Sequence, residues 1–158
     1  MKDLATIEAT YSKIDGALEQ QRDTATAAGD RTAASHVEQR QRINDQAYFV
    51  LCWGQLELEI NTRCRNAIRR RWKSRQWQTR RGWDLYNPDD DRLSGLSFEN
   101  RTALILDRKA GPGSPWARVM RHYQVRNQIA HGTLLAQRID VSATVADFYT
   151  IQGALATG

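Results

Sequence analysis

Residues 49–72 read FVLCWGQLELEINTRCRNAIRRRW, and their pattern indicates the main helix of the protein. Its large apolar side chains recur every three or four residues, the spacing of one face of an α-helix. They are Phe49, Trp53, Leu56, Ile60, Cys64, Ile68 and Trp72. Glu57 and Glu59 fall off this line. We therefore predict a long helix, from about residue 35 to about residue 75, that forms the spine of the core.

Upstream of the long helix lies a capping signal and, before it, a second apolar stripe. Ser35 and Glu38 form a Ser-x-x-Glu capping box, in which each side chain satisfies a backbone N–H of the first turn. The earlier stripe predicts an amphipathic helix that runs to about Ala27, where Gly29 ends it. This stripe consists of Leu4, Ile7, Tyr11, Ile14 and Leu18.

Downstream of the long helix, turn-forming residues separate shorter helices. Residues 81–95, RGWDLYNPDDDRLSG, contain Gly, Asn-Pro and four aspartates, which predicts a loop. A third, shorter helix is expected to start near Ser97 and to stop at the Ala-Gly-Pro-Gly of residues 110–113.

Two more helices complete the chain. Ser114 and Pro115 have the types preferred at an N-cap and at the first helical position, so a fourth helix is predicted from there to about His131, with Gly132 as its C-cap. Residues 141–155, VSATVADFYTIQGAL, predict a fifth helix. The fold class is therefore all-α, a bundle of four or five helices.

Composition and length agree with a single helical domain. The 158 residues are 41% hydrophobic and 26% charged, an ordinary globular balance, and 158 residues suffice for one core. The first ten residues lack the apolar core of a signal peptide, and the longest apolar run, residues 47–53, is too short to span a membrane. We expect a soluble, cytoplasmic protein without a membrane partner.

Cys52 and Cys64 are expected to fill the core. On one helix they would lie ~18 Å apart along the axis, whereas a disulfide needs Cα atoms within ~7 Å. The three histidines, at positions 36, 122 and 131, show no zinc-ligand spacing. No metal site and no cofactor are predicted.

Positive charge is concentrated at the end of the long helix. The net charge is +5, yet residues 63–83 hold nine basic residues and no acid, so the remainder carries −4. Trp72, Trp77 and Trp83 are interleaved with the cations. Basic side chains neutralise phosphates and indoles stack on unpaired bases, which suits single-stranded or looped RNA. A solvated helix end with Trp72 in the core is the alternative. The predicted RNA-binding residues are Arg63, Arg69, Arg70, Arg71, Lys73, Arg75, Trp77, Arg80 and Arg81.

The apolar stripe of the fourth predicted helix ends on polar residues. Continuing from Tyr123 by fours, its buried-facing line reaches Asn127 and then His131, and Arg126 lies beside it. Polar groups that face a core cost free energy unless they find partners, so capping or a bond to a neighbouring helix is one explanation. Phosphate chemistry is the other, because Arg offers a fork of donors and His moves a proton near neutral pH.

Residues 126–131, RNQIAH, resemble the signature of the HEPN superfamily, which is an Arg, a short spacer that usually begins with a polar residue, and a His. The resemblance implies an HEPN-like helical bundle over residues 1–158 and a metal-independent endoribonuclease of the toxin or phage-defence type. Arg126 would hold the scissile phosphate, Asn127 would position the phosphate or the imidazole, and His131 would act as general base or acid. Thr133 stands where family toxins with a nucleotidyltransferase antitoxin commonly carry Tyr, so control by tyrosine modification is not expected.

The implied chemistry uses the 2′-hydroxyl of the RNA and leaves a 2′,3′-cyclic phosphate. It needs one group to accept a proton and another to donate one, each worth ~10²–10⁴-fold in rate. One copy of the chain supplies one motif histidine, and family members dimerise through the late helix. The expected partners are therefore RNA, a second copy bound through the motif helix, and an antitoxin protein.

Two other functions fit the same residues. One is a catalytically silent HEPN-like bundle that binds RNA or scaffolds a defence complex. The other is a DNA-binding regulator that uses residues 63–81, although no clear helix-turn-helix spacing supports it.

Overall fold

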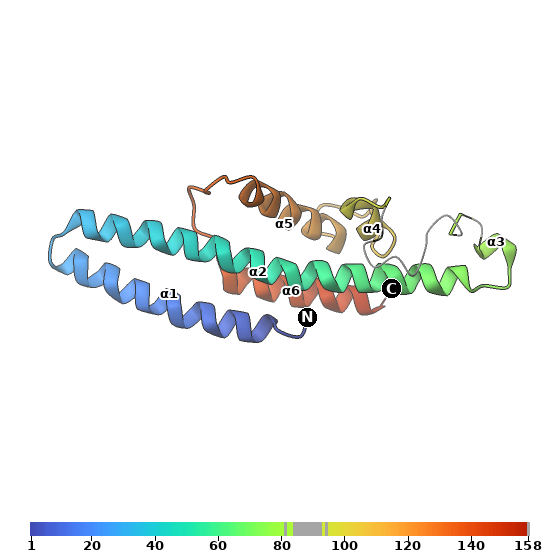
Figure 1. Cartoon of the computed structure of the whole chain (residues 1–158), viewed down its shortest axis with the longest axis horizontal. Helices are drawn as coiled ribbons and strands as arrows, with labels where there is room; N and C mark the ends of the chain where they lie inside the picture. The colour runs from blue at the N-terminus through green and yellow to red at the C-terminus, as the bar shows by residue number, and fades with distance from the viewer. Residues whose placement is uncertain (81, 84–92, 94, 158) are drawn as a thin grey trace. The chain divides into compact units, whose positions relative to one another are not determined.

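The computed structural model describes residues 1–80, 82–83, 93 and 95–157, and every regular element in these ranges is an α-helix (Figure 1). The elements are α1 (Leu4–Ala27), α2 (Arg31–Trp72), α3 (Trp77–Arg80), α4 (Phe98–Ala103), α5 (Pro115–Ala130) and α6 (Val141–Thr157). The predicted all-α class is confirmed, and α3 is a short helix that the sequence reasoning missed. Within the described ranges, no helix has the length and apolar character needed to cross a lipid bilayer.

The chain forms two compact units, each built from two stretches of sequence. The first unit contains residues 1–55 and 122–149, and the second contains residues 56–121 and 150–158. As a result, α2, α5 and α6 each contribute residues to both units. The single domain over residues 1–158 stays a prediction.

In the first unit, α1 and the beginning of α2 form a helical hairpin (Figure 1). Gly29 in its turn has a φ of 73°, a conformation that glycine adopts without strain. The Asp30 carboxylate accepts a hydrogen bond of 2.9 Å from the Ala33 backbone N–H. The predicted capping box at Ser35 is therefore wrong, because Asp caps as well as Ser and lets α2 begin at Arg31.

The α1 stripe is buried at every seventh residue, at Leu4, Tyr11 and Leu18. The prediction is wrong for Ile14, whose side chain is 40% exposed. Its neighbour Asp15 faces α2 instead, where its carboxylate accepts a hydrogen bond of 3.3 Å from Gln41.

The remaining core of the first unit packs on Phe49 and Trp53 of α2, both fully enclosed. The Trp53 indole stacks on Tyr123 of α5 at 5.9 Å between ring centroids and meets Phe148 of α6 edge-on at 6.4 Å. These aromatic contacts attach the ends of α5 and α6 that belong to this unit to α2.

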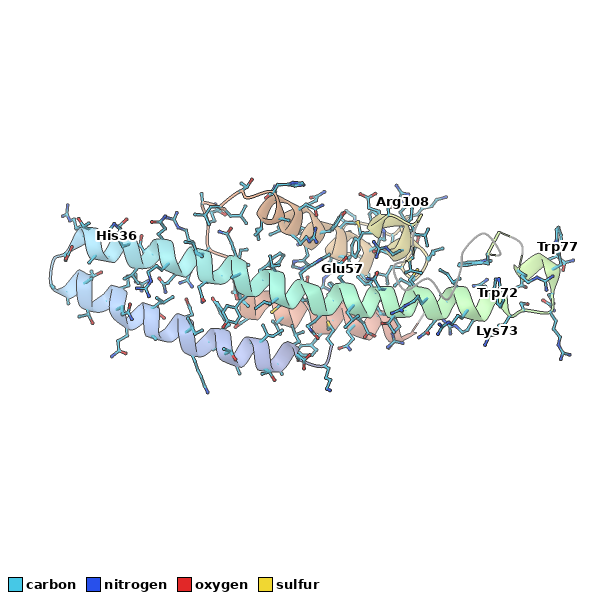
Figure 2. All side chains as sticks on the ribbon, in the orientation of Figure 1. His36, Glu57, Trp72, Lys73, Trp77 and Arg108 are labelled. Atoms are coloured by element: carbon cyan, nitrogen blue, oxygen red, sulfur yellow. The ribbon has the colours of Figure 1, made fainter. Side chains whose placement is uncertain are left out.

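In the second unit, the α2 stripe is buried from Leu56 as far as Ile68. Leu93 and Leu96 pack on Cys64 and Ile68, and Trp83, Leu104 and Ile105 lie half-buried against them. The prediction that Trp72 continues the core is wrong, because its side chain is 45% exposed (Figure 2). The apolar residues that cover this face of α2 meet it at Cys64 and Ile68, one turn before Trp72.

Both cysteines are buried and unbridged, as predicted for core residues. Burial raises the pKa of the Cys52 thiol, in the first unit, to about 11. It raises the pKa of the Cys64 thiol, in the second unit, to about 11 as well. In both cases the thiolate would be poorly solvated.

Side-chain caps start the three later helices. The Ser114 hydroxyl accepts a hydrogen bond of 3.2 Å from the backbone N–H three residues on, as predicted for an N-cap, and the Ser97 hydroxyl does the same at 3.2 Å. Asp140 does the same for α6 at 2.8 Å. The predicted third, fourth and fifth helices are therefore confirmed, although α4 already ends at Ala103, before residues 110–113.

Candidate functional site

The last turn of α5 holds the motif residues in a defined backbone geometry. The His131 N–H donates to the Asn127 carbonyl at 3.0 Å. The Gly132 N–H then donates to Ile129 at 2.9 Å, and the Thr133 N–H donates to Gln128 at 3.1 Å. With a φ of 80° at Gly132, this is a Schellman C-cap. The predicted C-cap glycine is confirmed, and His131 is the last residue before it.

The side chains of the motif lie at the surface or half-buried. Arg126 and Asn127 are half-buried, and Arg126 Nη1 donates a 3.2 Å hydrogen bond to Asn127 Oδ1. His131 is exposed. The prediction that the buried-facing line of α5 continues to His131 is therefore wrong. After Met120, every residue of α5 is half-buried or exposed.

The connection between α5 and α6 (residues 131–140) is fastened to α2. The Gln46 side chain donates to the Leu135 carbonyl at 3.3 Å and accepts from the Leu135 N–H at 3.2 Å. Arg42 donates to the Ala136 carbonyl at 3.2 Å. These bonds hold the backbone that follows His131 in place.

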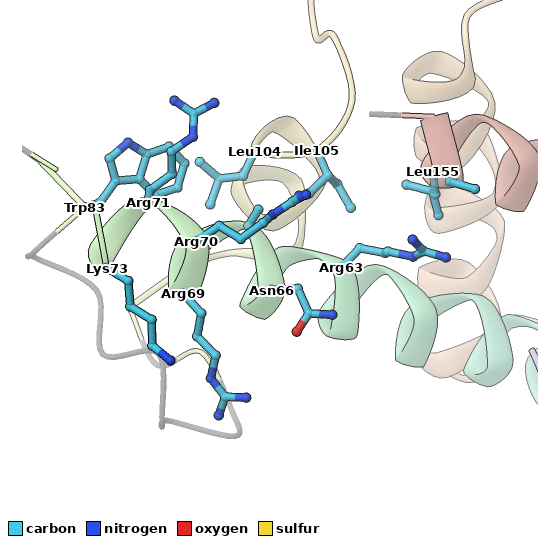
Figure 3. A pocket seen from close by; sticks show the side chains of 12 residues that line it. Arg63, Asn66, Arg69, Arg70, Arg71, Lys73, Trp83, Leu104, Ile105 and Leu155 are labelled. Atoms are coloured by element: carbon cyan, nitrogen blue, oxygen red, sulfur yellow. The ribbon is translucent and has the colours of Figure 1, made fainter. Parts of the chain in front are cut away.

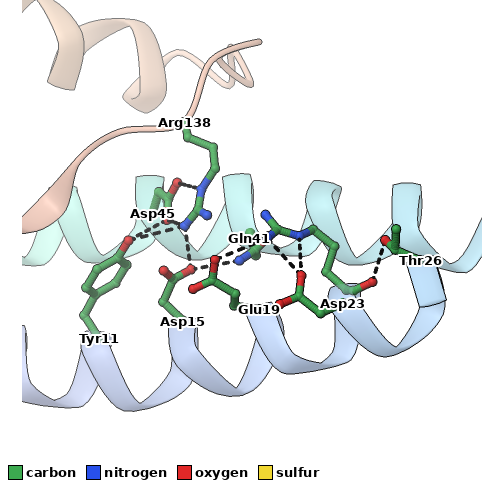
Figure 4. A network of polar contacts seen from close by, with 9 residues as sticks. Tyr11, Asp15, Glu19, Asp23, Thr26, Gln41, Asp45 and Arg138 are labelled. Carbon is green, nitrogen blue, oxygen red and sulfur yellow. Dashed lines mark hydrogen bonds and ion pairs between the residues drawn. The ribbon is translucent and has the colours of Figure 1, made fainter.

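An ion-pair network around one buried carboxylate, the Arg138 clamp (Tyr11, Asp15, Asp45 and Arg138), fixes the same connection (Figure 4). The Arg138 side chain itself is 38% exposed. Arg138 donates through Nε to Asp45 Oδ2 at 2.8 Å and through Nη2 to Asp45 Oδ1 at 2.9 Å. Its Nη2 also contacts Asp15, and the Tyr11 hydroxyl donates to Asp45 at 2.9 Å. Asp45 is fully buried, so the clamp joins α1, α2 and the connection around one enclosed carboxylate.

The clamp shifts the titration of its members. Burial, and then the hydrogen bond to Asp45, raise the pKa of Tyr11 well above the ordinary tyrosine value. The hydrogen bonds to the two carboxylates raise the pKa of Arg138. Tyrosine therefore stays neutral and arginine stays charged, which suits a structural role. Sequence reasoning missed the clamp, although Asp45 lies four residues before Phe49 on the α2 stripe.

His122 has a partner that the sequence reasoning did not find. Its Nε2 lies 2.7 Å from Asp147 Oδ2, and its ring meets the edge of Phe148 at 4.9 Å between centroids. The His122 and Asp147 side chains are 15% and 18% exposed. The pair joins α5 to α6 in the first unit, and no short sequence pattern links residues so far apart.

In the second unit, five of the predicted RNA-binding residues line a cavity of about 780 Å³ (Figure 3). They are Arg63, Arg69, Arg70, Arg71 and Lys73. Sequence reasoning missed the other lining residues, which are Asn66, Ala67, Trp83, Leu104, Ile105, Leu155 and Ala156.

The remaining predicted RNA-binding residues lie elsewhere. Arg75 and Trp77 are exposed, with Trp77 at 59% (Figure 2), and Arg80 donates to the Ser74 carbonyl at 3.0 Å. Arg81 and most of the predicted loop over residues 81–95 lie outside the described residues.

The charge of the cavity is uneven. Arg63 Nε pairs with Glu59 at 2.8 Å, so an acid one helical turn upstream partly compensates the basic run. The Arg71 guanidinium lies over the Trp83 ring, 5.5 Å from its centroid, and so occupies one face of that indole. Among the described residues, no carboxylate lies within ion-pair distance of Arg70, and Figure 3 shows its side chain extending toward Ile105, so it is a candidate for binding an anion in the cavity.

Comparisons of this chain with protein families, with curated proteins and with solved structures find no match. What the chain does is therefore inferred from its own residues, above all from the motif at the end of α5 and from the cationic cavity.

Proposed function

We propose that this chain is a metal-independent endoribonuclease of the HEPN type, acting in toxin or defence systems. One observation carries the proposal. Arg126 and Asn127 lie near the end of α5 and His131 directly follows the helix, with the imidazole exposed and the guanidinium hydrogen-bonded to the amide. The Schellman cap and the fastened α5–α6 connection fix the backbone around these groups. A phosphate that approaches from solvent would meet them in this arrangement.

The proposed reaction divides the work among the three side chains. A motif histidine takes the proton from the 2′-hydroxyl, and the 2′-oxygen attacks the adjacent phosphorus. The bond from phosphorus to the 5′-oxygen breaks, and a protonated histidine gives that oxygen its proton, so the products are a 2′,3′-cyclic phosphate and a 5′-hydroxyl. Arg126 would bind the non-bridging oxygens in the transition state, while Asn127 orients the guanidinium.

The reaction needs two histidines, and the helix geometry favours taking them from two chains. Arg126 and His131 are five residues apart, which places them ~140° apart around a helix of ~100° per residue. One phosphate therefore reaches Arg126 of one chain and His131 of another more easily than both from the same α5. A two-fold dimer through the ends of two α5 helices would place both histidines in one groove.

The test is cleavage of RNA in excess EDTA. We expect His131→Ala and Arg126→Ala to lose most of the activity, since each would remove a catalytic group. His36→Ala and Arg121→Ala are matched controls, because both side chains are exposed helical residues outside the motif. Activity that needs a metal, or that survives both motif substitutions, would refute the nuclease.

A dimer through α2 is the competing arrangement. In the first unit, Ile43, Val50 and Leu51 of this helix are 49%, 37% and 54% exposed. Leu51 lies two residues before Trp53, ~200° around the helix and so away from the side that contacts α5. Light scattering of Leu51→Asp and Gln128→Asp distinguishes the two dimers. If only Leu51→Asp is monomeric, the dimer forms through α2 and the composite site at the ends of two α5 helices is refuted.

A catalytically silent RNA-binding bundle is the second candidate, and the cationic cavity favours it. Replacing Arg69, Arg70 and Arg71 by Ala is expected to weaken RNA binding and to flatten its dependence on salt. Tight binding that leaves the RNA intact in the cleavage assay would select this candidate, including its role as a scaffold in a larger complex.

A further inference from the structure

We propose that the cavity of the second unit holds one unpaired nucleotide of an RNA strand, with the base against its aliphatic wall and the phosphate against its arginines. The inference shares RNA as the ligand with the proposed function but requires no cleavage. The observation behind it is that cationic and aliphatic residues line different parts of the cavity.

One wall comes from α2 and is polar and cationic. Arg63, Asn66 and Arg70 line it at spacings of three and four, so they lie on one face of the helix. Figure 3 shows the Arg70 side chain extending toward Ile105 and the Asn66 amide between Arg63 and Arg69. A guanidinium binds phosphate oxygens, and an amide both donates to and accepts from a base edge.

A second part of the lining is aliphatic. Leu104 and Ile105 follow α4, Leu155 comes from α6, and all three line the cavity (Figure 3). A nucleobase has apolar faces, so it can lie on this aliphatic wall while Arg70, which extends toward Ile105 (Figure 3), binds the phosphate. Trp83 also lines the cavity, but Arg71 lies over its ring, so the aliphatic residues are the surface that a base would meet.

The size of the cavity limits the ligand. Small-molecule sites have volumes of roughly 300–1,000 Å³, and this cavity, at about 780 Å³, lies within that range. The bases of a duplex are stacked and paired, so they cannot enter such a cavity, whereas an unpaired base can. The site should therefore distinguish single strands from duplexes.

Cations that line the cavity away from its aliphatic residues, together with one cation outside it, favour a strand over a free nucleotide. Figure 3 shows Arg69 and Lys73 directed away from Leu104 and Ile105, and Arg75 follows Lys73 as an exposed cation. Flanking phosphates of a continuous strand can reach these side chains, while a mononucleotide has no phosphates to offer them. The exposed Trp77 adds a surface on which a further base can stack.

The experiment measures binding of a labelled single-stranded oligoribonucleotide by fluorescence anisotropy, with the His131→Ala chain so that cleavage plays no part. Ala156→Trp fills the cavity mouth without changing the charge, since Ala156 is an exposed lining residue. We expect it to abolish the preference for the single strand over the matching duplex. Ala143→Trp, an exposed site on α6 in the first unit, is the control and should leave the preference unchanged.

Arg70→Gln tests the phosphate contact. We expect about a tenfold loss of affinity near 0.1 M salt and a salt slope lower by about one. Arg31→Gln, an exposed arginine at the start of α2, is its control.

Three outcomes would overturn the proposal. They are equal affinity for single strand and duplex, an Ala156→Trp chain that behaves like its parent, and competition by poly-glutamate or by adenosine monophosphate as strong as that by the strand. If single-strand binding holds while the wild-type chain fails to cut RNA in EDTA, the nuclease alone is refuted.

Discussion

Arg138 in the first unit and Arg70 in the second show two opposite uses of one residue type. Arg138 is bound by two carboxylates, one of them fully buried, and its hydrogen bonds fasten the connection after the motif helix. Arg70 lines a cavity, and no carboxylate of the described residues pairs with it. A cation that is paired with a buried carboxylate maintains the fold, whereas a cation at a cavity wall without such a partner is available to a ligand.

A count of basic residues in the sequence therefore does not locate a binding surface. Arg63 belongs to the same basic run as Arg70, yet it pairs with Glu59 at 2.8 Å. Substitution of the two kinds of arginine should therefore affect different measurements, stability in one case and binding in the other.

The largest effect is expected from breaking the Arg138 clamp. Arg138→Met leaves the buried Asp45 carboxylate without its cation, which should lower the free energy of unfolding by about 1–3 kcal/mol, since the Arg138 side chain is 38% exposed. Urea unfolding followed by circular dichroism measures the loss. The double variant Asp45→Leu/Arg138→Met should recover much of it, because no buried charge remains. If Arg138→Met is as stable as the parent, the clamp does not stabilise the fold.

Alkaline pH should lower the stability of both units, because each unit contains one buried cysteine thiol. The pKa values of Cys52 and Cys64 rise from 9.0 to about 11. An unfolded chain therefore loses these protons first, and stability falls as pH rises from 9 toward 11. Unfolding at pH 8 and pH 10.5 is the measurement, and Cys52→Ala or Cys64→Ala should each reduce the slope. An unchanged slope in both variants would contradict the burial of the thiols.

A smaller effect is expected at the C-cap of α5. Gly132 has a φ of 80°, so Gly132→Ala should cost about 1 kcal/mol of stability. Thermal unfolding would register this loss, and Gly113→Ala, whose φ is not positive, is the control with little effect. If this cap also positions His131, the rate of RNA cleavage by Gly132→Ala should fall even at temperatures where the variant is fully folded.

The smallest effect on stability is expected at the cavity. Arg70→Met should change the free energy of unfolding by less than ~0.5 kcal/mol, as for most surface substitutions, while it weakens RNA binding. Compared with Arg138→Met in the same two assays, it separates the two uses of arginine. A stability loss as large as that of Arg138→Met would remove the distinction.

Local patterns predicted much of the fold because local rules determine it. The spacing of Phe49, Trp53 and Ile60 predicted α2, and Ser97 and Ser114 predicted the starts of two helices. The early start of α2 was missed because Asp30 and Ser35 are both good caps, and sequence does not choose between them.

The candidate sites were predictable only in part. The motif at residues 126–131 and the basic run are continuous in sequence, and so is the Glu59–Arg63 pair, which its spacing of four could have revealed. The aliphatic wall of the cavity was out of reach, since Leu104 and Leu155 meet α2 only through tertiary packing. The same holds for the partnership of His122 with Asp147.

The most direct test of the proposed function is the digestion of total RNA in excess EDTA by the wild-type chain beside His131→Ala, with the product ends mapped. The nuclease proposal predicts 2′,3′-cyclic phosphate and 5′-hydroxyl ends from the wild type and at least a ~10²-fold slower reaction from the variant. Intact RNA, cleavage that requires added metal, or equal cleavage by the two proteins would contradict it.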